Sequence, residues 1–95
     1  MLKIKDPVLK NQIIQRLSRV EGQLRGVQKM IDEDRDCKEI VQQLLAIRSA
    51  VQSASLTFIQ DVASECLLDL EQGGNLDDQR QKMNDLIQLM GKLSS

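Results

Sequence analysis

The chain has 95 residues, 41% of them hydrophobic and 28% charged, with a net charge of −1, which fits one small globular domain. It contains no histidine and a single aromatic residue, Phe58, which excludes an imidazole base, a histidine-ligated metal site and an aromatic platform for unpaired bases. No apolar run approaches the ~18 residues of a membrane span, and the N-terminus lacks the apolar core of a secretory signal, so we expect a cytoplasmic protein.

The first predicted helix covers about residues 7–33. Asp6 and Pro7 form a typical start, an N-cap followed by a proline in the first turn. Apolar residues then recur at alternating spacings of four and three, the pattern of a helix that packs along its length on another helix. The members of this seam are Ile13, Leu17, Val20, Leu24, Val27 and Ile31. Gly22 and Gly26, four residues apart on one face, indicate close packing rather than a break.

The second predicted helix covers about residues 37–71. It follows a charged break at residues 32–36, in which either Asp34 or Asp36 can be the N-cap. The apolar stripe is wide and continues to about Glu71, which is long compared with the average helix of a globular protein. A stripe of this width and length indicates packing against more than one neighbour.

The third predicted helix covers about residues 76–92. It follows the clearest turn in the chain, where Gly73 suits a C′ position and Asn75 an N-cap. No strand pattern competes with the helical one anywhere. The sequence therefore predicts an all-α fold, with three helices and a long central one, in a single domain of residues 1–95. A core of this size with a single aromatic residue in the whole chain is thin, and oligomerisation is a common remedy.

The two cysteines, Cys37 and Cys66, lie 29 positions apart on the second predicted helix. At about 100° and 1.5 Å per residue they share a face but are roughly 44 Å apart, so they cannot form a disulfide within one helix. They can meet if the helix pairs antiparallel with its copy about an axis near Val51 and Gln52, because each end of this dimer then joins Cys37 of one protomer to Cys66 of the other. The alternative is that each cysteine is an ordinary small buried residue.

The neighbours of the two thiols suggest different roles. Cys37 falls in the first turn of its helix, near Arg35 and Lys38, where the helix N-terminus and the cations favour a thiolate against the neighbouring carboxylates. Cys66 lies late in the helix beside Glu65, where negative surroundings favour the thiol. We therefore expect Cys37 to react first and Cys66 to resolve the product.

Basic residues are concentrated in the N-terminal third of the chain. Residues 1–30 carry seven lysines and arginines against two acidic residues, a net charge of +5, whereas residues 61–79 carry six acidic residues and no basic one. Arg16 and Arg19 are three residues apart and share a helix face, which can touch phosphates. The alternative interpretation is a solvated helix face without a ligand.

The run RLSRVEGQLRGV at residues 16–27, followed by Cys37 and the segment AIRSAV, resembles the CsoR/RcnR family of small bacterial metal- and thiol-sensing repressors. The resemblance covers nearly the whole chain. It implies an all-helical protomer, a dimer with antiparallel central helices, and a flat tetramer built from two dimers. It also implies binding to double-stranded operator DNA without a conventional helix-turn-helix. The residues that it assigns to DNA are Arg16, Arg19, Arg25, Arg48, Lys3 and Lys5.

The chain departs from the copper-sensing members of this family, which use a Cys, a His and a second Cys. Val62 stands one helical turn before Cys66, where those members have the histidine, and Leu2 stands where formaldehyde-sensing members have a proline. The remaining pattern is similar to the persulfide-sensing branch, called CstR. That resemblance implies no metal or other cofactor, and a repressor that releases its operator when persulfide or polysulfide joins Cys37 to the partner's Cys66 through a di-, tri- or tetrasulfide.

Two alternatives remain open. One is a copper(I)-responsive repressor that uses the thiolates of Cys37 and Cys66 alone, because soft Cu(I) accepts thiolates. The other is a helical oligomerisation module with no role on DNA. We expect no enzymatic activity, because the sequence has no catalytic triad, metal cluster or glycine-rich phosphate loop.

Overall fold

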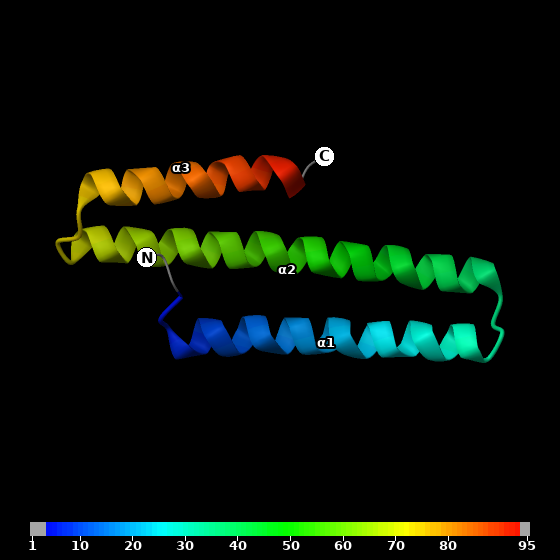
Figure 1. Cartoon of the computed structure of the whole chain (residues 1–95). Coiled ribbons are helices and arrows are strands. Elements are labelled where there is room, and N and C mark those ends of the chain that lie inside the picture. The colour runs from blue at the N-terminus through cyan, green and yellow to red at the C-terminus, as the bar shows by residue number, and fades with distance from the viewer. Residues whose placement is uncertain (1–3, 94–95) are drawn as a thin grey trace.

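The protein is a single layer of three helices in the computed structural model, which describes residues 4–93 (Figure 1). The helices are α1 (Pro7–Asp32), α2 (Cys37–Glu71) and α3 (Leu76–Leu93), and no strand occurs in the described range. α2 lies in the middle, with α1 along one side and α3 along the other (Figure 1). The predicted all-α protomer is confirmed, and no helix end differs from its predicted place by more than one residue. No described helix has the length and apolar character needed to cross a membrane.

Each helix begins with a side chain that accepts a hydrogen bond from a backbone amide two or three residues later. The acceptors are Asp6 at 2.8 Å, Asp36 at 3.3 Å and Asn75 at 3.1 Å. Gly73 follows α2 with a φ of +94°, in the left-handed region that glycine adopts without steric cost. Of the two residues that the sequence offered as the cap of α2, the structure selects Asp36.

Asp34 ends α1 instead. Its φ is +56°, and its amide donates to the Ile31 carbonyl at 3.1 Å, while the Arg35 amide donates to the Met30 carbonyl at 2.9 Å. These two bonds are those of a Schellman motif, in which the left-handed position is usually a glycine. An L-residue pays roughly 1–2 kcal/mol for this conformation, so the turn between α1 and α2 holds some backbone strain.

The core is thin because the layer is one helix thick. The chain measures 57 × 29 × 15 Å, and a helix with its side chains is itself about 10–12 Å wide. α1 buries every seventh residue, Ile13, Val20 and Val27, and the last two form a cluster with Ile47 of α2. The other half of the predicted seam of α1 is exposed, and it comprises Leu17, Leu24 and Ile31.

α2 also leaves apolar side chains uncovered along much of its length. The exposed ones are Val41, Leu44, Leu45, Val51, Leu56, Phe58, Leu67 and Leu68. α1 and α3 lie along two sides of α2 and leave its remaining faces open (Figure 1). Soluble monomers rarely expose contiguous apolar patches of this kind, so these faces have the character of an interface.

Candidate functional site

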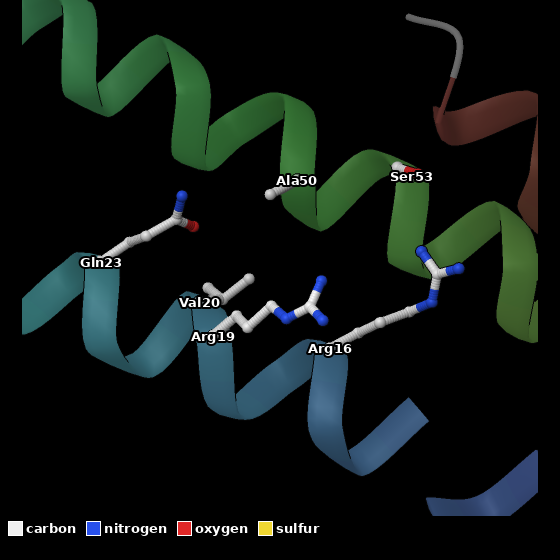
Figure 2. Close-up of a pocket in the computed structure, with 6 residues that line it drawn as sticks. All are labelled: Arg16, Arg19, Val20, Gln23, Ala50 and Ser53. Carbon is white, nitrogen blue, oxygen red and sulfur yellow. The ribbon is translucent and has the colours of Figure 1, made fainter. Parts of the chain in front are cut away.

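A shallow groove between α1 and α2 carries two arginine side chains (Figure 2). Its volume is about 300 Å³, and it is lined by Arg16, Arg19, Val20 and Gln23 of α1 and by Ala50 and Ser53 of α2. The buried Val20 and the half-buried Ala50 form an apolar floor. Figure 2 shows the guanidinium groups of Arg16 and Arg19 reaching from α1 toward α2. Two guanidinium groups beside an amide and a hydroxyl suit an oxyanion such as a phosphate.

The positive charge of this groove is uncompensated. Within residues 4–93 neither Arg16 nor Arg19 forms an ion pair, whereas the Arg35 guanidinium lies 3.0 Å from a carboxylate oxygen of Glu39. A second shallow groove, of about 330 Å³, continues the same face and shares both arginines. It is lined by Gln12, Gln15, Arg16 and Arg19. The structure thus joins the two arginines singled out in the sequence into one cationic patch flanked by neutral polar side chains.

The other basic residues assigned to DNA lie apart from the two grooves. Arg25, Arg48 and Lys5 are exposed, and none of them lines either groove. Lys3 lies outside the described residues. Of the five that the structure describes, only Arg16 and Arg19 line a common groove.

Cys37 is the first residue of α2 and is exposed. Asp36, just before it, caps the helix by accepting a hydrogen bond from the Lys38 amide at 3.3 Å. One of the cations expected near this thiol is engaged elsewhere, because the Arg35 Nε donates to Glu39 at 3.2 Å. Cys37 is therefore an accessible thiol at a helix N-terminus, and Arg35, two residues before it, is held by a carboxylate.

Cys66 has a different environment, since only 1% of it is exposed. Its Sγ donates a hydrogen bond to Oε1 of Gln79, 2.6 Å away on α3, and Gln79 is itself buried at 5% exposure. Gln79 was not among the residues predicted from the sequence. Met83 and Leu86 lie on one apolar face of α3, and position 79 continues this face toward the start of the helix. A polar residue at such a position was the sequence signal that could have identified Gln79.

The residue before Cys66 ties α2 to the start of α1. The Oε1 atom of Glu65 accepts a hydrogen bond from the backbone amide of Asp6 at 3.0 Å, and Asp6 is the N-cap of α1. Ile4, just before this contact, is buried. The end of α2 that holds Cys66 is therefore the place where all three helices are connected.

The two thiols cannot meet within one chain, because 29 helical residues separate them by roughly 44 Å. Among the side chains that the structure describes, no group of three or more His, Cys, Asp or Glu residues is placed to hold a metal ion. Val62, one turn before Cys66, is a buried apolar residue that offers no ligand atom.

Comparisons with known proteins place the chain in a family. Residues 9–92 match the family described as metal-sensitive transcriptional repressor. The copper-sensing transcriptional repressor CsoR of Bacillus subtilis (strain 168) is 35% identical over 85 residues, which are 90% of this chain and 81% of that protein. The copper-sensing transcriptional repressor RicR of Mycobacterium tuberculosis is 40% identical over 58 residues, which are 61% of this chain and 60% of that protein.

A solved structure shows the same arrangement of helices. The nickel-responsive transcriptional regulator InrS matches with a TM-score of 0.74 and 26% sequence identity, over 93% of this chain and 96% of that one. The family is made of transcriptional repressors and not of enzymes, in agreement with the expectation from the sequence. With the motif at residues 16–27, the helical layer and these matches all in agreement, the chain belongs to the CsoR/RcnR family of metal-sensitive transcriptional repressors.

Proposed function

We propose that this cytoplasmic repressor binds operator DNA with the cationic patch of Arg16 and Arg19, and that it senses reactive sulfur through Cys37 and Cys66 of two protomers. The layout of α2 carries the proposal. The helix has an exposed thiol at its first residue, a buried thiol near its far end, and uncovered apolar side chains between the two. An antiparallel copy of α2 would cover the apolar side chains and bring each Cys37 to the partner's end that holds Cys66.

The symmetry of such a dimer follows from the positions of the cysteines. A twofold axis that relates Cys37 to Cys66 passes α2 between Val51 and Gln52, and the exposed Val51 lies at that centre. We propose further that two dimers form a flat tetramer. Exposed apolar residues outside α2, such as Leu24 of α1 and Ile87 of α3, support a second interface.

The sensing chemistry balances with an organic persulfide as the only oxidant. The Cys37 thiolate attacks the terminal sulfur of the persulfide, the S–S bond breaks, the organic thiol leaves, and Cys37 becomes a persulfide. The thiolate of Cys66 in the partner protomer attacks the Cys37 Sγ and expels hydrosulfide, which leaves a disulfide. If both cysteines carry a persulfide, their condensation releases H₂S and leaves a trisulfide, and polysulfide donors extend the chain to a tetrasulfide in the same way.

Mass and gel analysis of the treated protein test this function. After anaerobic treatment with an organic persulfide, we expect a covalent dimer on denaturing gels without reductant, with any added sulfur seen as increments of about 32 Da. We also expect the treated protein to release a duplex that the reduced protein has selected from random sequence. A cross-linked protein that holds this duplex as tightly as the reduced protein does would contradict the sensing role.

Copper(I) is a second candidate inducer, favoured by the two copper-sensing relatives. Cys37 and the partner's Cys66 supply two thiolates, and such soft donors fit Cu(I). Val62 leaves the position one turn before Cys66 without a third ligand, so the donor set is poorer than one that includes an imidazole. Anaerobic titration with Cu(I), run beside the persulfide treatment, separates the two inducers: if copper alone releases the duplex, the persulfide proposal is wrong.

A further inference from the structure

The buried thiol of Cys66 faces its own α3 and not a free surface. Its Sγ lies 2.6 Å from Oε1 of Gln79 and 4.0 Å from the Gln79 backbone carbonyl. With 1% of Cys66 and 5% of Gln79 exposed, the first turns of α3 close over the sulfur. A thiol in this position has no room for the in-line approach of a sulfur atom from another protomer.

Gln79 is also the most buried of the α3 side chains that the structure describes. Among the α3 side chains that the structure describes, Gln79 alone is buried, whereas Lys82, Met83 and Leu86 are half-buried. The apolar side chains of Leu76, Ile87 and Leu89 are exposed. The hydrogen bond between Cys66 and Gln79 is therefore a buried interaction between α2 and α3, whereas several other α3 side chains lie at the surface.

The start of α3 nevertheless has a defined geometry. The Asn75 side chain caps the helix by accepting from the Asp78 amide at 3.1 Å, and Lys82 Nζ lies 2.8 Å from a carboxylate oxygen of Asp78. Gly73, in the left-handed conformation, connects this helix start to the end of α2. The first turns of α3 are thus a locally ordered unit, joined to α2 through a short glycine-containing turn.

We propose that Gln79 is a latch that holds α3 over Cys66 and keeps this thiol unreactive until the first turns of α3 detach. The latch is a property of a single chain, and its role in sensing rests on the proposed function. Two consequences follow. Cys37, which is exposed, reacts first, and the docking of α3 on Cys66 excludes the bridge to the partner's Cys37, so that each bridge displaces α3.

Alkylation by iodoacetamide measures the latch without any need for the bridge. The full-length reduced protein is alkylated, and the rates at Cys37 and Cys66 are followed separately by peptide mass. In the wild type we expect Cys66 to react at least about tenfold more slowly than the exposed Cys37, which serves as the internal reference. Gln79→Met keeps the volume of the side chain but removes the acceptor oxygen, and we expect it to speed Cys66 about fivefold, as the loss of one ordinary hydrogen bond predicts.

Two further variants separate the latch from general destabilisation. Gln79→Ala removes the cover as well as the acceptor, so the Cys66 rate should rise beyond that of Gln79→Met while Cys37 keeps its rate. Gln81→Met makes the same exchange at an exposed position of α3 and should change neither rate. Equal rates at the two cysteines in the wild type, or Gln79 variants of unchanged helical content that leave Cys66 slow, would overturn the latch.

A further experiment keeps Gln79 unchanged, so it tests the latch even if the Gln79 variants fail to fold. In Cys37→Ala protein, alkylation driven to completion at Cys66 should speed amide hydrogen exchange in the first turns of α3, and unchanged protection there refutes the latch. Failure of the sensing proposal has a different signature. In that case persulfide yields no covalent dimer, while the Cys66 alkylation rate still depends on residue 79 as expected.

Discussion

Truncating the arginines of the groove is the most direct perturbation of the proposed DNA interface. Neither Arg16 nor Arg19 pairs with a carboxylate within residues 4–93, and both are exposed, so their replacement by alanine leaves no acidic group without its partner. Each change removes one positive charge from the patch and leaves the buried Val20, next to Arg19 in the chain, in place. We therefore expect Arg16→Ala and Arg19→Ala to preserve folding and assembly and to weaken DNA binding alone.

The size of the effect follows from counterion release. Each arginine–phosphate contact adds about −0.9 to the slope of log affinity against log salt, which corresponds to about fivefold in affinity at 0.15 M salt. The double variant should lose about thirtyfold for each protomer that touches the duplex, with a slope less negative by about 1.8. The losses of the two single variants should add on the logarithmic scale if each side chain meets its own phosphate.

Fluorescence anisotropy with a labelled duplex, recorded between low and physiological salt, supplies both the affinity and the slope. Arg80→Ala, which removes an exposed arginine from α3, is the matched control and should leave both unchanged. If Arg16→Ala and Arg19→Ala retain the wild-type slope, the groove is not the DNA interface. A wild-type protein that shows no salt-dependent binding to any duplex would instead fit an oligomerisation module without a role on DNA.

Three further predictions concern the thiols and the helix ends. Cys37→Ala should keep DNA binding but lose the persulfide response, whereas Cys66→Ala should leave Cys37 open to modification without a covalent dimer, as intact mass and gels without reductant will show. Asp34→Gly should raise the free energy of unfolding in urea by about 1 kcal/mol, because glycine relieves the left-handed φ of +56°; a decrease would mean that the Asp34 side chain stabilises this turn. The hydrogen bond from Lys82, aided by its charge, holds the pKa of Asp78 below the ordinary value of 3.8, so the stabilisation from this pair is present above that pH and is lost as the pH falls through the lower pKa of the folded state. Thermal melts should therefore show a smaller acid destabilisation in Lys82→Met than in the wild type, and identical acid profiles would count against a stabilising role for the pair.

Some features of the protein were predictable because they depend on residues close together in the chain. Asp6, Asn75 and Gly73 act at the helix ends where their local patterns predict them, since a cap is made with an amide a few residues away. Asp34 was the exception. Its backbone is left-handed although it is not a glycine, and the choice between Asp34 and Asp36 as the cap of α2 depended on how the chain turns between two packed helices.

The candidate site also combines features that the sequence predicts with one that depends on the fold. Helical periodicity sets Arg16 and Arg19 on one face and keeps Cys37 and Cys66 apart on one long helix, so the cationic stripe and the need for a second protomer could be argued from spacing alone. The bond between Cys66 and Gln79 joins residues 13 positions apart on two different helices, and no local pattern specifies it. It accounts for the burial of Cys66, whereas the neighbouring charges in the sequence indicated only that Cys37 and Cys66 differ in thiolate character.

By itself, the amino-acid sequence determined that the chain forms three helices with a long middle one, where these helices end, and that one end of the chain is basic, because these properties follow from local periodicity and composition. Only the tertiary structure decided which half of the α1 seam is buried, that α2 lines the arginine groove with Ala50 and Ser53, and that Gln79 closes over Cys66. Those features depend on the rotation and offset of one helix against another. Rotation and offset are set by the sum of many weak side-chain contacts between distant segments, which no single stretch of sequence contains.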